Sequence, residues 1–107
     1  MAAHVHTNDF TNVVLKSEVP VLVDFYAQWC GPCRLQSPVL DELANESGGT
    51  YQVVKVDVDK DPELATKFNV TALPTLMLFA GGQVMERYVG LQQKGTLKSV
   101  LAASAAH

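Results

Sequence analysis

The sequence holds few of the residues from which metal and nucleophile sites are built. It contains only two cysteines and three histidines, and the histidines, His4, His6 and His107, stand near the two ends of the chain. A zinc site takes four ligands, and a cysteine hydrolase takes an imidazole positioned beside its thiol. We therefore predict no metal, no cofactor and no hydrolase chemistry.

Long apolar runs and an excess of positive charge are also missing. No apolar segment comes near the ~20 residues that span a bilayer, and residues 1–4, MAAH, lack the layout of a signal peptide. The formal net charge is -3, and the lysines are spread singly along the chain. We predict that neither a membrane nor a nucleic acid is a partner. We expect a cytoplasmic location, with an organelle matrix reached after removal of a transit peptide left open.

Linkers, internal repeats and heptads are absent as well. The 107 residues, 48% of them hydrophobic, therefore predict one domain, residues 1–107, and a monomer. Strands alternate with helices in the apolar pattern, which predicts an α/β fold with a mixed sheet and helices on its faces. The predicted strands are 4–6, 19–26, 51–58, 74–80 and 83–89; the predicted helices follow an N-cap at Thr7, span 33–45 and 62–68, and begin near Lys94.

The two cysteines stand close together, in the segment WCGPC at 29–33, directly after the predicted strand 19–26. A disulfide between them closes so small a loop that folding gains almost nothing from it. In a reducing compartment a close cysteine pair is more often catalytic or metal-binding than structural. The sequence therefore predicts a redox dithiol.

Topology gives the two sulfurs different roles. The helix that follows a strand in a parallel crossover begins at the carboxyl edge of the sheet, where reaction sites are common. Because a helix N-terminus favours a thiolate, we predict that Cys30 is the attacking thiolate, with an exposed sulfur, and that Cys33 is the resolving thiol. Gly31 lets a partner backbone approach, and Pro32 fixes the first helical φ. This uncharged pair favours a reductant over an oxidase.

Asp24 interrupts an otherwise apolar strand. A buried carboxylate is costly unless it is paired or protonated, so burial would raise its pKa and suit it to take the proton of Cys33 through water. Lys55, set among valines, is a candidate counter-charge. The alternatives are a partly exposed Asp24 on an edge strand and a solvated Lys55.

Several segments together resemble the thioredoxin family. The resemblance rests on VLVDFYAQWCGPC at 21–33 and Pro38, followed by KVDVD at 55–59, LPT at 73–75, FAGG at 79–82 and VG at 89–90. Because these segments occur in the family's order and at its spacing, the resemblance covers nearly the whole chain. It implies the thioredoxin fold, a central five-stranded mixed β-sheet flanked by four α-helices, and a small carrier that reduces protein disulfides.

The resemblance also implies a site and partners. Asp24 would assist the deprotonation of Cys33 with Lys55 nearby, and Pro74 would be a cis proline packed against the dithiol. The partners would be disulfide-containing target proteins and a thioredoxin reductase, linked to NADPH or to ferredoxin. The docking surface for targets would consist of Trp29, Gly31, Pro32, Leu73, Gly90 and Leu91.

Taken without the resemblance, three of these residues have simpler interpretations. A lone tryptophan such as Trp29 is more often a core aromatic than a recognition residue. Pro74 before an apolar strand would ordinarily be trans, and Gly90 would mark a bulge.

Several positions depart from the family pattern. Tyr26 stands where tryptophan is frequent, Arg34 stands where lysine is common, and residues 71–72 carry no charge. None of these touches the sulfur chemistry, but with the bulky Leu91 they alter the rim of the docking surface and leave target preference open. The alternative functions are a disulfide isomerase or oxidase of the same fold, and a redox-independent scaffold subunit.

Overall fold

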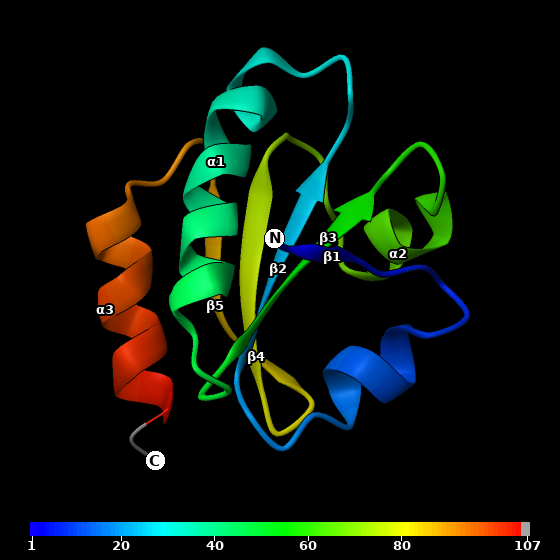
Figure 1. Ribbon diagram of the computed structural model, residues 1–107. Helices are drawn as coiled ribbons and strands as arrows, with labels where there is room; N and C mark the ends of the chain where they lie inside the picture. The colour runs from blue at the N-terminus through cyan, green and yellow to red at the C-terminus, as the bar shows by residue number, and fades with distance from the viewer. Residues whose placement is uncertain (106–107) are drawn as a thin grey trace.

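The computed structural model describes residues 1–105, and a mixed β-sheet runs through the middle of this part of the chain (Figure 1). Its five strands in residues 1–105 have the spatial order β1-β3-β2-β4-β5. β3 is parallel to β1 and β2, whereas β4 is antiparallel to β2 and β5. The strands are β1 (Ala3–His4), β2 (Val21–Tyr26), β3 (Gln52–Asp57), β4 (Thr75–Ala80) and β5 (Gln83–Val89).

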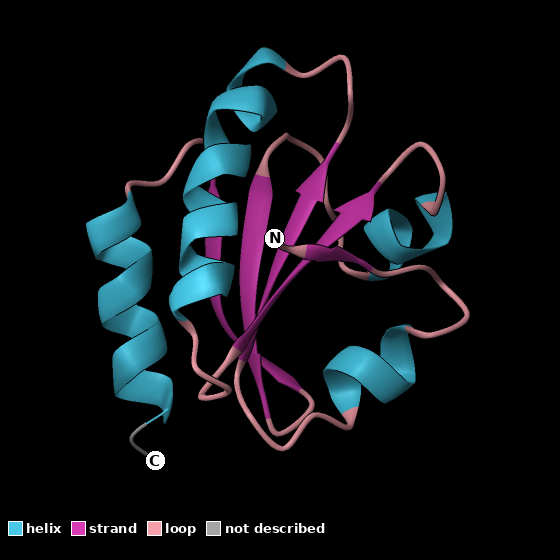
Figure 2. Cartoon of the chain, in the orientation of Figure 1, coloured by secondary structure: helices cyan, strands magenta, loops and turns pink. Residues whose placement is uncertain are grey.

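Helices cover both faces of the sheet (Figure 2). α1 (Gly31–Glu46) and α3 (Lys94–Ala105) lie on one face, and η1 (Thr11–Leu15) and α2 (Pro62–Lys67) lie on the other. The predicted mixed sheet with helices on both faces is confirmed. Of the four helical segments in residues 1–105, however, three are α-helices and η1 is π-helical.

All of β2 is buried, because each face of the sheet carries its own core. Its odd-numbered residues pack with Phe10 and Leu64, beside η1 and α2. Leu22, on the opposite face, packs with Leu40 and Leu97 from α1 and α3. Since successive residues of a strand point to opposite faces, a strand covered on both sides reads as one apolar run. Asp24 therefore lies on the α1 face of a strand that has no solvent-exposed side.

Most helices and strands begin or end a few residues away from the predicted boundaries. β5 spans the predicted residues 83–89, but β2 begins only at Val21, after a proline that has no N–H for the ladder. β1 lies at Ala3–His4 instead of 4–6, because the chain turns at His6, where the backbone N–H donates to the Asp9 carboxylate. α2 ends at Lys67, one residue before the predicted end at Phe68.

Thr7 is not the N-cap that the sequence predicts. Its backbone N–H donates to Oδ1 of Asp61 at 3.0 Å, and its hydroxyl donates to Asp61 and to Glu63. The residue that precedes η1 is Phe10, which makes no side-chain cap. Thr7 instead ties the N-terminal segment to the start of α2, a contact between residues far apart in the sequence.

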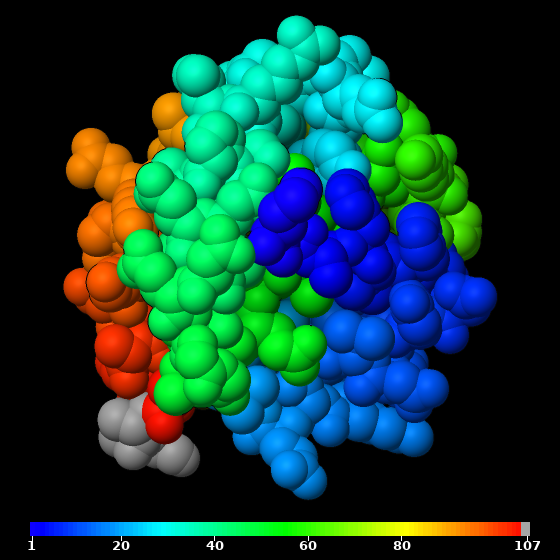
Figure 3. Space-filling view, viewed as in Figure 1, coloured from blue at the N-terminus to red at the C-terminus, as the bar shows by residue number. Residues whose placement is uncertain are grey.

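The N-terminal residues also lie against α1, as the space-filling view shows (Figure 3). The amino group of Met1 donates to Oδ1 of Asn45 at 2.8 Å, and the N–H of Ala2 donates to Oδ1 of Asp41 at 3.0 Å. His107 lies outside the described residues. Within residues 1–105, every helix is too short or too polar to cross a membrane.

Two glycines form the turn between β4 and β5. Gly81 and Gly82 have φ angles of 59° and 79°, in the region that L-residues rarely adopt. Their surroundings differ. A Cβ at Gly82 would lie 2.9 Å from the carbonyl oxygen of Leu15, whereas a Cβ at Gly81 would meet nothing within 4 Å.

Gly82→Ala is therefore expected to destabilise the protein more than Gly81→Ala. Both substitutions place an L-residue at positive φ, which costs roughly 1–2 kcal/mol. Only at Gly82 must the backbone of Leu15 also move, which adds roughly 1–3 kcal/mol. Urea denaturation measures both losses, and equal losses in the two variants would contradict the close approach.

Candidate active site

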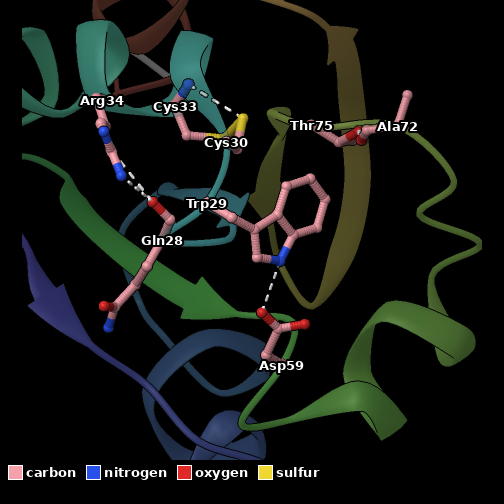
Figure 4. Close-up of a disulfide and its surroundings, with 8 residues drawn as sticks. All are labelled: Gln28, Trp29, Cys30, Cys33, Arg34, Asp59, Ala72 and Thr75. Atoms are coloured by element: carbon pink, nitrogen blue, oxygen red, sulfur yellow. Dashed lines mark hydrogen bonds between the residues drawn. A yellow bond between two sulfur atoms is a disulfide. The ribbon is translucent and has the colours of Figure 1, made fainter.

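Cys30 is the N-cap residue of α1. Its backbone is extended, with φ -86° and ψ 114°, and a proline follows in the first turn. Its Sγ accepts a hydrogen bond from the N–H of Cys33 at 3.2 Å (Figure 4). A sulfur thus occupies the place that a serine or aspartate oxygen takes at an ordinary N-cap. The unpaired N–H groups and the positive end of the helix dipole favour negative charge on this atom.

Cys30 and Cys33 form a disulfide across the first turn of the helix, with their Cα atoms 5.3 Å apart. α1 begins at Gly31, earlier than the predicted start at Cys33, because the capping residue is Cys30. The predicted exposed attacking sulfur is wrong for this oxidised form, since Cys30 is only 5% exposed and Cys33 only 3%. The two cysteines form a small buried cluster with Tyr26 and Ala27, and the partly buried Val58 and Leu73 pack against it.

Asp24 is fully buried, so the alternative of a partly exposed edge residue is wrong. Neither carboxylate oxygen accepts a hydrogen bond from the residues that the structure describes. Burial raises the pKa of Asp24 to about 7, and the positive charge of Lys55 opposes that rise. Asp24 can therefore both take up and release a proton near neutral pH.

Lys55 acts on Asp24 through space and not by contact. The two residues are register partners in β2 and β3 and point to the same face. The Nζ of Lys55 donates to Oγ of Ser37 on α1 at 2.7 Å and lies 4.6 Å from the centroid of the Tyr26 ring. Lys55 is half-buried and also lines the cleft beside the dithiol, so it is neither enclosed in the core nor fully solvated. Its predicted role as a counter-charge is present as an electrostatic effect without an ion pair in residues 1–105.

A cleft of about 300 Å³ opens beside the dithiol. Arg34 lines this cleft, and its Nε and Nη2 donate to the carbonyl oxygen of Gln28 at 3.2 and 3.0 Å (Figure 4). A cleft of this volume that several polar side chains line admits water, which can carry a proton to or from the buried sulfur. The residues that line it are Tyr26, Ala27, Gln28, Cys33, Arg34, Ser37 and Lys55.

Trp29 is a surface residue and not the core aromatic that its residue type alone suggests. It is 70% exposed, and its indole N–H donates to Oδ2 of Asp59 at 2.9 Å (Figure 4). Gly31 and Pro32, which follow it, are exposed as well. The hydrogen bond holds a large apolar ring in place beside the dithiol, where it can meet a partner chain.

The loop before β4 and the loop after β5 meet each other. The Leu73–Pro74 peptide bond is cis, as the resemblance implies and contrary to the expectation from the residues alone. The carbonyl oxygen of Pro74 accepts a hydrogen bond from the N–H of Gly90 at 2.8 Å. Gly90 is not a bulge; the register shift between β4 and β5 lies at residues 78–79. Leu91, directly after Gly90, is 49% exposed.

Sequence analysis missed three side chains around this site. Asp59 holds Trp29, Ser37 holds Lys55, and the fully buried Gln36 bonds to the backbone of Gln92. A signal was present only for Gln36. It stands at helical spacing between Cys33 and Leu40, so it is a polar residue on the inward face of its helix.

Comparisons with known proteins identify the same family as the sequence motifs. The sequence model of the Thioredoxin family matches residues 1–103. Thioredoxin 1 of Nostoc sp. is 48% identical over 100 residues, which are 94% of this chain and 94% of that protein. The thioredoxin of Rickettsia felis is 41% identical over 97 residues, 91% of this chain and 92% of that protein. The chloroplastic M-type thioredoxin of Chlamydomonas reinhardtii is 45% identical over 96 residues, 90% of this chain and 69% of that protein.

The buried carboxylate predicts how stability depends on pH. Because the pKa of Asp24 is about 7 in the folded protein and 3.8 ordinarily, the folded state binds the extra proton between these values. The free energy of unfolding should therefore fall as pH rises from about 4 to 7 and level off above, a loss of up to roughly 4 kcal/mol. We expect Asp24→Asn to lack this fall in urea denaturation across that range.

Two further variants test the cause of this pH dependence. Asp59→Asn, which removes an exposed carboxylate, should keep the fall. Lys55→Ala removes the charge that lowers the pKa of Asp24, so the fall should continue to higher pH. An unchanged pH profile in Asp24→Asn would contradict a protonated Asp24 in the folded state.

Proposed function

The chain belongs to the thioredoxin family and is a protein-disulfide reductase with a Cys-x-x-Cys active site, and from that premise we propose how its own residues divide the reaction. Cys30 is the attacking thiolate and Cys33 is the resolving thiol. The observation that carries this assignment is the N-cap position of Cys30, because its sulfur accepts a hydrogen bond from a first-turn N–H, that of Cys33.

The exchange proceeds in two displacements. In the first, the Cys30 thiolate attacks one sulfur of a target disulfide, so that a Cys30–target bond forms, the target S–S bond breaks, and one target thiolate leaves. In the second, the Cys33 thiolate attacks the Cys30 sulfur, forms the disulfide of the oxidised protein, and expels the other target thiolate. The two thiolates take up protons, and two electrons pass from the dithiol to the target.

Asp24 takes the proton of Cys33 before the second displacement. A general base works best when its pKa lies near the ambient pH, and burial raises the pKa of Asp24 to about 7. Cys33 and Lys55 line a cleft with room for water, whereas Asp24 is not among its lining residues, so the proton passes from that water inward to the buried carboxylate. Lys55 keeps the pKa of Asp24 from rising further, so that a fraction of Asp24 stays ionised at neutral pH.

Target chains dock on the exposed apolar residues around the dithiol. Trp29 and Leu91 are strongly exposed, and Gly31 leaves an open approach where a Cβ would meet nothing within 4 Å. The remaining members of this docking surface are Pro32, Leu73 and Gly90, with Pro74 behind them. A partner chain that docks on this surface is reduced only if it holds a disulfide with a sulfur within reach of Cys30.

Reduction of the oxidised protein requires an outside electron source. We assign this step to a thioredoxin reductase that draws on NADPH or on ferredoxin, in a reducing cytoplasm or organelle matrix. The uncharged Gly31-Pro32 pair favours a reductant, because nothing between the cysteines adds further stabilisation to the thiolate. A charged residue between the cysteines would favour a disulfide isomerase or oxidase, and Gly31 and Pro32 carry no charge.

Serine substitutions separate the two sulfurs. Cys33→Ser keeps the attacking thiolate and loses the resolving one, so it should accumulate a mixed disulfide with insulin. Cys30→Ser should form far less adduct, because its remaining sulfur is not the helix cap, and both variants should lose catalytic insulin reduction. Mass spectrometry under non-reducing conditions measures the adducts.

The assignment of the two sulfurs fails if Cys30→Ser traps insulin as readily as Cys33→Ser. Retention of biological activity in Cys30→Ser would indicate a scaffold subunit.

A further inference from the structure

Gln36 is a fully buried polar side chain on the redox helix, one turn after Cys33. Its amide makes two hydrogen bonds with the backbone of a single residue, Gln92. Nε2 of Gln36 donates to the Gln92 carbonyl oxygen at 3.1 Å, and the Gln92 N–H donates to Oε1 of Gln36 at 2.7 Å. A buried amide is costly unless it is paired, and this one is paired through its donor and its acceptor.

Gln92 lies in the loop that joins β5 to α3, which passes beside the first turns of α1 (Figure 1). The loop has no ladder or helix to fix it, so the bonds from Gln36 hold its backbone. A further bond within the loop runs from Nε2 of Gln92 to the carbonyl oxygen of Gly90 at 3.1 Å. Gly90 in turn donates its N–H to Pro74 at 2.8 Å.

These contacts form one hydrogen-bonded chain. It runs from α1 through Gln36, Gln92 and Gly90 to Pro74, and so connects the dithiol helix to the two loops that flank the dithiol. Leu91 stands between Gly90 and Gln92, and 49% of it is exposed. Gln36 itself is 0% exposed, so no partner chain can touch it. Any effect of Gln36 on partners must therefore pass through the loop that it holds.

We propose that Gln36 is a positioning residue that fixes Leu91 relative to the Cys30–Cys33 pair and thereby sets the efficiency of the protein towards protein disulfides. The inference rests on the proposed docking surface. The efficiency towards small disulfides, which react at Cys30 without covering Leu91, does not depend on the position of Leu91. A partner chain that binds a preordered Leu91 avoids the entropy cost of ordering the loop.

Gln36→Met tests the proposal, because methionine has a similar length and an unbranched, apolar side chain that fills the space without either hydrogen bond. We expect kcat/KM for insulin to fall about tenfold, through a higher KM, and kcat/KM for hydroxyethyl disulfide to change less than about twofold. Exchange of the Gln92 amide hydrogen should accelerate by about tenfold or more.

Tyr51→Phe is a matched control. The Tyr51 hydroxyl donates to the Leu43 carbonyl oxygen of α1 at 2.7 Å and is also buried, but it lies at the other end of the helix. Its removal should leave the ratio of the insulin and hydroxyethyl disulfide efficiencies unchanged. Leu91→Ala should lower that ratio as Gln36→Met does. A double variant that combines Gln36→Met with Leu91→Ala should lower the ratio little further, since both changes remove the same contact with the partner.

The outcomes separate this inference from the proposed function. Equal losses on insulin and hydroxyethyl disulfide, or no loss on either, would overturn the positioning role of Gln36. If Gln36→Met does not fold, Leu91→Ala alone still decides, because an unchanged ratio in that variant would overturn the proposal. Failure of the unaltered protein to reduce either disulfide would contradict the proposed function itself.

Discussion

The start of α1 is the constraint on which the rest of the site depends. β2 delivers the chain to the sheet edge, and Cys30 caps the helix with its sulfur instead of an oxygen. The hydrogen bond from the N–H of Cys33 caps the helix at the same sulfur that forms the disulfide. In the proposed mechanism, the capping of the helix and the stabilisation of the Cys30 thiolate are therefore one interaction.

A second constraint follows from covering β2 on both faces. This arrangement leaves no solvent-exposed side for Asp24, so the carboxylate is buried without a hydrogen bond from residues 1–105. The protein is less stable at neutral pH for that reason, because an ionised buried carboxylate disfavours the folded state. A carboxyl group with a pKa of about 7 therefore lies on the face of the sheet that carries the dithiol helix. Under the role proposed for Asp24, the burial that suits this residue to accept a proton also lowers the stability of the fold.

The sequence was most informative where short segments determine the structure. The apolar run of β2, the segment 29–33 and the hairpin glycines predicted the central strand, the dithiol and the turn, because each depends on neighbours in the chain. Apart from the charge interaction between Lys55 and Asp24, the residues themselves did not predict long-range contacts. Thr7 was expected to cap a helix, but it bonds to Asp61, and the residue type of Trp29 favoured the core, whereas Trp29 is 70% exposed. The pair of Gln36 and Gln92 joins residues 56 positions apart, which no local pattern reports.

In the proposed mechanism the helix start makes the Cys30 sulfur an easily formed thiolate. The rate at which iodoacetamide alkylates the reduced Cys33→Ser protein, measured as a function of pH, tests this property. Cys30 should react rapidly at pH values well below those at which the thiol of glutathione reacts. A pH dependence equal to that of glutathione would contradict this mechanism, because the capping position would then contribute nothing to the chemistry.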